Sequence, residues 1–168
     1  MNKRGISALV ATVLLVLITV AAVGIIWGAI MPMITRTMQL GQACIDAMVL
    51  IKEDRTCIDT NNNEVHVMVQ RGTKDFNLSA IALFLEGEAG SKGRDIKDNK
   101  KTDGVRMFDK TYDNATILPG TGEFVVYVIN STAVGISNPT GVSVAPVVKS
   151  GDIEKMCDTI SVSLKSCA

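Results

Sequence analysis

The chain has 168 residues, of which 17 are basic and 17 are acidic, so its formal net charge is zero. This balance gives no support for nucleic-acid binding, because proteins that bind nucleic acids neutralise phosphates with an excess of Lys and Arg. Hydrophobic residues make up 47% of the chain and aromatic residues only 4%, and the length allows one globular domain besides an apolar N-terminal stretch.

The apolar stretch covers residues 6–31 and contains no charged side chain. As a helix it would be about 39 Å long, which exceeds the hydrocarbon core of about 30 Å. It is also too long for the apolar core of an ordinary signal peptide, about 7–15 residues. Lys3 and Arg4 on the short N-terminal flank favour a cytoplasmic N-terminus. We therefore expect a membrane-spanning helix that places the rest of the chain outside the cell.

The junction Lys3-Arg4-Gly5 followed at once by Ile6 and the apolar run resembles the class III signal peptide of archaeal type IV pilins and archaellins. This resemblance implies that a membrane prepilin peptidase cuts between Gly5 and Ile6. The helix would remain on the mature protein, first in the membrane and then in the core of a filament. Bacterial type IV pilins carry Glu at the fifth mature position, which is Val10 here, so the resemblance is to the archaeal branch.

Cleavage would remove Lys3 and Arg4 and so make the helix easier to extract from the membrane. An apolar helix that leaves lipid must be buried elsewhere, and a bundle of identical helices would bury it. Small residues that allow close helix approach lie along it at Ala21, Gly24 and Gly28. Because Gly and Ala are common in membrane helices, chance is the alternative explanation for this spacing.

Pro32 follows the apolar run directly and is expected to kink the helix, because proline lacks a backbone N–H. The helix could continue to Leu40, and Gly41 is the expected stop. The predicted division of the chain is a leader (1–5), the hydrophobic helix (6–42) and an extracellular β-domain (43–168).

The remainder of the chain is rich in strand patterns with no long helix between them. Segments 78–85 and 124–129 are continuously apolar and are expected to be central strands. Pro146 predicts an edge strand or a bulge, and the glycine-rich polar segment 87–104 predicts an exposed, mobile loop. The predicted strands are 45–52, 56–59, 64–71, 78–86, 105–109, 123–130, 142–149 and 159–165.

This pattern predicts an antiparallel, immunoglobulin-like β-sandwich. Together with the N-terminal helix it gives an α+β fold. Under the resemblance stated above, this would be the lollipop-shaped architecture of a pilin.

The four cysteines all follow the apolar helix and predict two disulfides in an exported domain; the alternative is four reduced, buried thiols. If the segment between Cys157 and Cys167 is one strand, it spans about 33 Å, too far for these two to bond. Each must then reach Cys44 or Cys57. If the last strand runs parallel to the first strands, the pairs are Cys44–Cys157 and Cys57–Cys167, which we prefer. A crossed placement gives Cys44–Cys167 and Cys57–Cys157. A local Cys44–Cys57 bond would need a turn in the last segment.

Three N-x-Ser/Thr sequons are candidate glycan acceptors in an exported chain. They begin at Asn77, Asn114 and Asn130. Asn114 and Asn130 are the preferred candidates, because they lie at expected turns or strand ends.

The sequence shows no catalytic motif of the hydrolase, phosphate-loop or dinucleotide type. His66 alternates with valines and should face solvent or a neighbouring subunit. Asp95, Asp98 and Asp103, with Asn99, could gather around calcium, but their spacing does not fit an EF-hand, and a solvated loop is preferred. With one His and no Cys-x-x-Cys, zinc binding is not expected. We predict no enzymatic activity, no cofactor and no metal site.

These observations favour a structural subunit of an archaeal type IV pilus-like filament that serves adhesion. Its expected partners are further copies of the chain, prepilin peptidase, the pilus assembly machinery and, before assembly, the membrane. The mature form would lie on the cell surface. The alternatives are an uncleaved single-pass membrane protein whose outer β-domain binds a ligand, and an extracellular enzyme.

Overall fold

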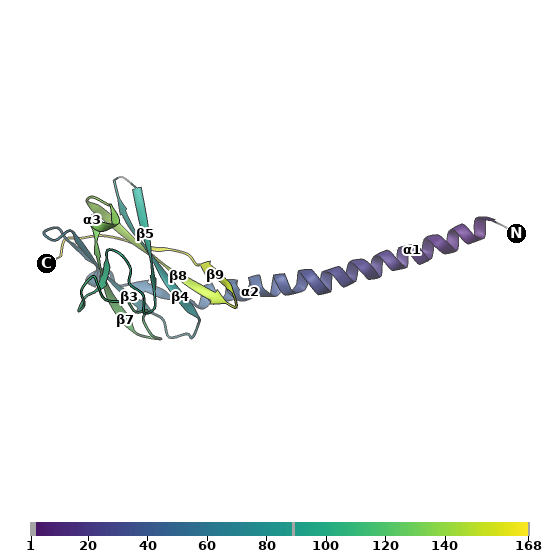
Figure 1. Cartoon of the computed structure of the whole chain (residues 1–168), viewed down its shortest axis with the longest axis horizontal. Coiled ribbons are helices and arrows are strands. Elements are labelled where there is room, and N and C mark those ends of the chain that lie inside the picture. The colour runs from purple at the N-terminus through teal and green to yellow at the C-terminus, as the bar shows by residue number, and fades with distance from the viewer. Residues whose placement is uncertain (1–2, 89, 168) are drawn as a thin grey trace. The chain divides into compact units, whose positions relative to one another are not determined.

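The computed structural model describes residues 3–88 and 90–167, with side chains from residue 9 onward (Figure 1). The chain divides into two compact units, Met1–Gln39 and Leu40–Ala168. The first unit is helical throughout its described part, whereas the second is built mostly from β-strands.

The helical segment has three parts, because its regular hydrogen bonding is interrupted before Pro32. They are α1 (Lys3–Ile25), the π-helical turn η1 (Ile26–Ile30) and α2 (Met31–Asp46). The N–H of Met31 donates to the carbonyl of Ile26, five residues back. Pro32 has no N–H to donate, and a proline ring clashes with the carbonyl four residues earlier. The disturbance expected at Pro32 therefore takes the form of an extra residue in one helical turn.

The predicted helix stop at Gly41 is wrong, because α2 continues to Asp46. Contacts within the second unit hold these last turns. Leu40 is buried in the core, Cys44 forms a disulfide, and Lys74 Nζ lies 2.5 Å from Asp46 Oδ1. Tertiary contacts thus outweigh the low helix propensity of glycine, about 1 kcal/mol below alanine.

One sheet contains five strands in the order β1-β3-β7-β6, with β2 also paired to β3. All of these pairs are antiparallel. The predicted strand 45–52 shrinks to β1, because α2 occupies its first residues. The strands are β1 (Val49–Ile51), β2 (Cys57–Asp59), β3 (Glu64–Arg71), β6 (Val105–Met107) and β7 (Phe124–Asn130).

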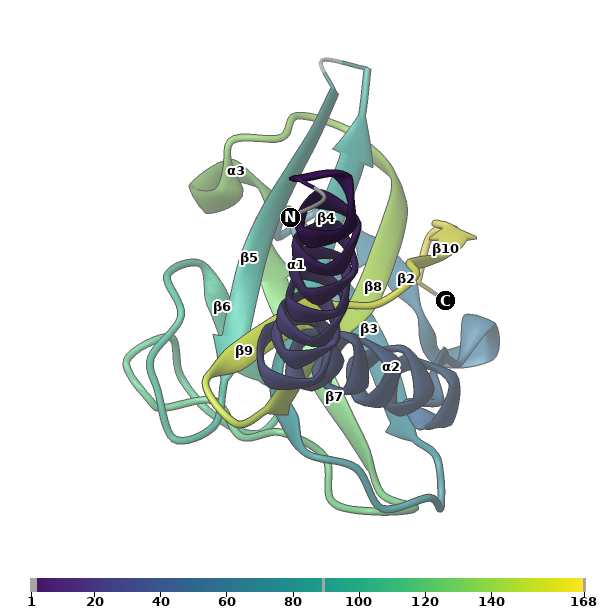
Figure 2. The ribbon, with the colours of Figure 1, turned by 90° about the vertical axis from the view of Figure 1, so that its right-hand side faces the viewer.

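The second sheet has the order β10-β8-β4-β5, with β9 also paired to β8. Figure 2 shows β5, β4 and β8 side by side. The central positions predicted for 78–85 and 124–129 are confirmed, because β4 lies between β8 and β5, and β7 lies between β3 and β6. The strands are β4 (Leu78–Gly87), β5 (Gly90–Lys97), β8 (Pro139–Ser150), β9 (Ile153–Met156) and β10 (Ile160–Ser163); the short helices of this unit are η2 (Glu53–Arg55) and α3 (Ser131–Val134).

Side chains from both sheets form one hydrophobic core. Alternate residues of β3 point into it, and Val65, Val67 and Val69 are fully buried. From the other sheet, Ile81 and Leu83 are among the residues that meet them. The predicted α+β architecture, an apolar N-terminal helix followed by antiparallel sheets, is confirmed at this level.

The predicted loop 87–104 is wrong in its first half, because β5 pairs with β4 from Gly87↔Gly90 to Ala80↔Lys97. The sequence pattern did not predict this strand, because β5 is at the edge of its sheet and only Ile96 is buried in it. Gly93 has a packing role, because a Cβ there would lie 2.6 Å from the ring of Phe84.

The edge-strand alternative for Pro146 is wrong, because β8 is an interior strand with β4 on one side and β9 and β10 on the other. Along the second side, β10 pairs as far as Val144, and β9 pairs from Val147 onward. Pro146 falls between these stretches, where the missing N–H interrupts neither ladder. The irregularity nearby is in β4, as a register shift between Leu78 and Ala80.

Candidate assembly surface and the cysteine-linked C-terminus

The described part of the first unit exposes every side chain from Leu9 to Gln39. Large apolar residues dominate this surface, and the exposed fraction is 60% for Leu17 and 67% for Trp27. The stretch Leu9–Asp46 is long and apolar enough to cross a membrane. A surface of this size is unstable in water, so lipid or other apolar helices must cover it.

The few hydroxyl groups on this surface do not require an external partner. Each threonine of the described helix donates its hydroxyl to a carbonyl of the same helix. The pairs are Thr12 with Leu9 (2.9 Å), Thr19 with Val16 (2.8 Å), Thr35 with Met31 (2.9 Å) and Thr37 with Met33 (2.9 Å). Because these groups are satisfied internally, burying the helix in an apolar environment leaves no threonine donor unpaired.

The predicted packing residues Ala21, Gly24 and Gly28 all lie on this exposed surface. A Cβ added at Gly24 or Gly28 would meet nothing within 4 Å. The fold of the single chain therefore does not require these glycines, and the space beside them is open to a neighbouring helix. Their role in helix packing stays a prediction.

The predicted cleavage site lies at the start of α1. The backbone of Lys3, Arg4, Gly5 and Ile6 is helical, but their side chains lie outside the described residues. Processing at this junction therefore stays a prediction.

All four cysteines are bonded, in the pairs Cys44–Cys157 and Cys57–Cys167. The Cα atoms are 5.4 Å and 5.0 Å apart, respectively. These are the preferred pairs, and the pairing is confirmed. The first bond fastens the last turns of α2, and the second fastens the C-terminal segment to β2.

The path of the C-terminal segment differs from the prediction. We expected its strand to lie against the first strands, but β10 pairs with β8. Only the residues after β10 run beside β2, in parallel: Ile58 N donates to Lys165 O (2.8 Å), and Cys167 N donates to Ile58 O (2.9 Å). These two hydrogen bonds place Cys167 next to Cys57.

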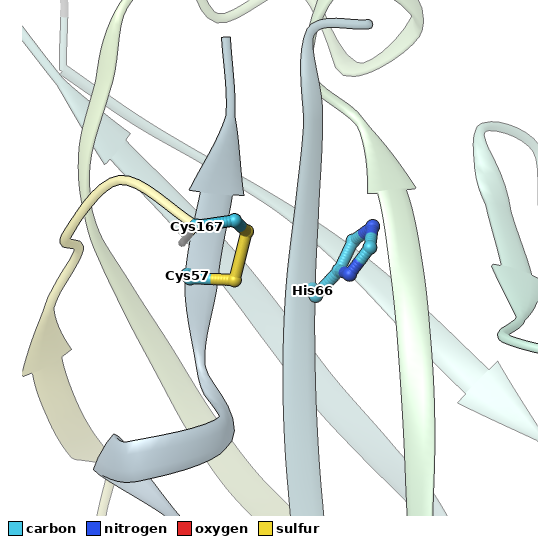
Figure 3. A group of neighbouring side chains, drawn as sticks. All are labelled: Cys57, His66 and Cys167. Carbon is cyan, nitrogen blue, oxygen red and sulfur yellow. A yellow bond between two sulfur atoms is a disulfide. The ribbon is translucent and has the colours of Figure 1, made fainter.

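His66 lies on β3 beside the Cys57–Cys167 bond, as Figure 3 shows. The ligand-type atoms of these three residues lie within 4.8 Å of one another. A metal would require thiolates, whereas both sulfurs are joined in a disulfide. The His66 ring packs edge-on against Phe108 at 5.7 Å, and Nε2 lies 3.9 Å from Glu64 Oε2. His66 therefore lies on the face of β3 opposite the buried valines, partly exposed and packed against Phe108; whether a neighbouring subunit covers it stays a prediction.

Among the acidic residues considered for calcium, Asp98 is hydrogen-bonded within the chain. Asp98 Oδ1 accepts a hydrogen bond from Leu118 N (3.1 Å), and Asp98 Oδ2 accepts one from Asn99 (2.9 Å). Asp95 lies on β5 opposite Ala82. In the part of the chain that the structure describes, these acids do not come together as a set of metal ligands.

A polar cluster on the first sheet was missed by the sequence analysis. Tyr112 Oη donates to Glu64 Oε1 (2.6 Å), and Arg106 Nη2 lies 3.0 Å from Glu64 Oε2. Burial raises the pKa of Glu64, but the hydrogen bond from Tyr112 and the pairing with Arg106 outweigh burial and hold it below its ordinary value. Burial and the bond to Glu64 raise the pKa of Tyr112 to about 12. The cluster fixes the segment after β6 against the sheet.

The three sequon asparagines have different surroundings. Asn77 and Asn114 are exposed, whereas Asn130 is half-buried. Asn130 Oδ1 accepts a hydrogen bond from Ala133 N (2.9 Å) and so caps α3. The glycosylation of each stays a prediction.

We compared the chain with protein-family models, with curated proteins and with solved structures, and none matches it. The function must therefore be argued from the exposed helix, the disulfide-linked β unit and the N-terminal junction.

Proposed function

We propose that the chain is a structural subunit of an extracellular archaeal type IV pilus-like filament. It is made as a membrane prepilin, cut between Gly5 and Ile6, and polymerised through its N-terminal helix for adhesion. The proposal rests on the helix surface from Leu9 to Gln39, which is exposed and nearly free of charge. Its threonine hydroxyls all donate to carbonyls of the same helix.

This surface suits two environments in succession. Between Ile6 and Thr35 there is no charge, and the first one after the apolar run is Arg36. Such a helix is stable in lipid, and after loss of Lys3 and Arg4 it can move into a bundle of its own copies without burying an unpaired charge. The open space at Gly24 and Gly28 supports close helix approach in that bundle.

The β unit is the part that the filament would present to its surroundings. Two disulfides support an extracellular location, because such bonds persist in oxidising compartments. In this proposal the two sheets are an immunoglobulin-like sandwich that forms the head of a lollipop-shaped pilin. The role assigned to the chain is structural, not catalytic.

Intact mass and N-terminal sequencing of surface material test the proposal, together with electron microscopy. We expect a mature chain that begins at Ile6 and assembles into thin filaments. Gly5→Val should leave the full-length precursor in the membrane without filaments. Asn2→Ala, which changes the leader outside the junction, should be processed normally.

Two results would contradict the proposal. A chain that keeps Met1 at the cell surface would support the alternative, an uncleaved membrane protein with an outer ligand-binding domain. A chain that begins at Ile6 but stays monomeric in the membrane would exclude polymerisation.

A further inference from the structure

The β unit carries a hollow of about 270 Å³, lined by both polar and apolar surface, that none of the features above explains. Three separate segments build it: the turn that precedes β6, the segment after β6, and the end of β7 with α3. The lining residues are Lys101, Asp103, Gly104, Tyr112, Asp113, Asn130 and Ala133.

Two of the lining residues are small. Gly104 has a φ of +76°, and a Cβ there would lie 3.1 Å from the Cβ of Ala133. Asn130 N donates to Gly104 O (2.8 Å), which holds the two segments together. A larger side chain at either position would fill the space, so the hollow depends on these residue types.

The wall on one side is an aromatic ring in a fixed position. Tyr112 Oη is bonded to Glu64, and the Arg106 guanidinium lies 5.3 Å from the centre of the ring. Because the ring is already ordered, a ligand that packs on it does not have to immobilise it.

The other walls offer both donors and acceptors. Lys101 Nζ lies 3.0 Å from Asp113 Oδ1, and Asp103 is an exposed carboxylate. Asn130 uses Oδ1 to cap α3, so its amide Nδ2 can still donate. Hydroxyl groups are the ligand groups that can both donate to the carboxylates and accept from the amide and the ammonium.

We propose that this hollow binds a neutral hexose residue. A sugar ring presents hydroxyls at its edge and apolar C–H groups on its face, which match the polar walls and the Tyr112 ring. The volume is just below the range of about 300–1,000 Å³ for drug-sized ligands, as expected for a single ring. The lining contains two acids and one base, so it disfavours anionic sugars.

The hexose can come from two sources. One is a glycan on another surface; the other is a glycan carried at Asn114, two residues from Tyr112, on this chain or on a neighbouring copy. Binding by the β unit does not depend on the proposed filament, although many copies along a filament would strengthen a weak contact by avidity.

Ligand-observed NMR titration of the full chain tests this proposal. The chain is produced with its disulfides in a host without N-glycosylation and kept in a zwitterionic detergent that has no sugar headgroup. The probes are glucose, galactose, mannose and N-acetylglucosamine, with glucuronate and galacturonate as anionic counterparts. We expect weak, saturable binding of at least one neutral hexose, and about fivefold or more weaker binding of its uronate.

Variants locate the site. Ala133 is exposed on α3, so Ala133→Leu should fold, fill the hollow and weaken binding about tenfold or more, whereas Ala133→Ser should bind normally. Asp103→Asn should narrow the difference between hexose and uronate. Asp109 is an exposed acid outside the lining, so Asp109→Asn should leave the difference between hexose and uronate binding unchanged.

The proposal is overturned if no neutral hexose shows saturable binding, or if Ala133→Leu binds as the wild type does. The source of the hexose is identified with protein that is produced in a host that glycosylates it. If the glycosylated chain binds free hexose more weakly than the unglycosylated chain, and Asn114→Gln restores the binding, the chain's own glycan occupies the hollow. If both forms bind free hexose equally, the bound glycan comes from another surface. Processing at Gly5 and filament formation are separate measurements, so either proposal can fail without the other.

Discussion

Glu64 illustrates how single residues hold the surface of the first sheet. Its side chain is only 14% exposed, yet both carboxylate oxygens have partners, Tyr112 and Arg106. A half-buried carboxylate without these partners would be strongly unfavourable. The partners lie 42 and 48 residues away in sequence, so no local sequence pattern predicts these contacts.

Glu64→Gln should lower the free energy of unfolding by about 2 kcal/mol at pH 7, because it removes charge-assisted hydrogen bonds. The folded pKa lies below the ordinary value of 4.5. The stabilisation by Glu64 is therefore present above pH 4.5 and is lost as the pH falls through the folded pKa. Urea unfolding at pH 7 and at pH 3 checks this: the difference between wild type and variant should shrink in acid. A difference that stays constant would contradict the ionic role.

Gly93 is the residue on which the β4–β5 hairpin depends for close packing. Gly93→Ala places a methyl group against the Phe84 ring and should cost about 1–3 kcal/mol of unfolding free energy. Ser91→Ala, an exposed site on the same strand, is the control and should be nearly neutral. If overlap of the added methyl group with the Phe84 ring is the cause, Gly93→Ala should lower the free energy of unfolding by less when Phe84 is replaced by Leu. A double-mutant cycle measures this difference.

At the scale of elements, the disulfides connect segments that local hydrogen bonds leave weakly attached. The described side chains of β9 are all exposed, and the short segment after β10 is joined to β2 by two backbone hydrogen bonds. The bonds close separations of 113 and 110 residues.

The double variant Cys44→Ser/Cys157→Ser should lose about 4–5 kcal/mol of unfolding free energy in the chain-entropy model. Amide hydrogen exchange should then be faster in the last turns of α2, because Cys44 no longer fastens them. Non-reducing peptide mapping of the wild type should give Cys44–Cys157 and Cys57–Cys167. Recovery of Cys44 linked to Cys167 would contradict the parallel placement.

The interruption of the helix at Pro32 is a second property of an element. Pro32→Ala restores an N–H that can donate to Gly28 O, so the π turn η1 should convert to regular α-helix. Amide exchange in detergent should show a protected amide at position 32 and stronger protection across 26–31. Unchanged exchange in that segment would mean that the π turn has another cause.

At the scale of the whole molecule, the two units carry separate tasks. In the proposed function the helix surface up to Gln39 meets lipid or other helices, whereas the β unit has its own core. Leu17→Arg should therefore impair membrane insertion, at a cost of about 2.5–3.5 kcal/mol near the bilayer centre, and should abolish filaments. The thermal midpoint of the β unit should not change, and Leu17→Met should behave as the wild type does. Filaments formed by Leu17→Arg would exclude this surface from the filament core.

Several features were predictable from the sequence because their causes are local. An uncharged run of 26 residues at 6–31 predicts a helix long and apolar enough to cross a membrane, and the structure has this helix. The alternation along β3 and the apolar runs in β4 and β7 determine central strands, since burial on one or both faces sets the pattern. The argument against a Cys157–Cys167 bond assumed one strand between them; β10 covers only Ile160–Ser163, but the pairing it favoured is the one found.

Other features were decided only by the tertiary structure, because they depend on contacts between residues far apart in the chain. Core packing of Leu40 and the Cys44 bond carry α2 past Gly41, against local propensity. Pairing with β4 makes β5 a strand in spite of its polar composition. The Glu64 cluster and the hollow beside Tyr112 bring together residues that no periodicity relates. Local patterns therefore determined which strands of the β unit are buried, whereas long-range packing decided where elements end and which polar groups meet.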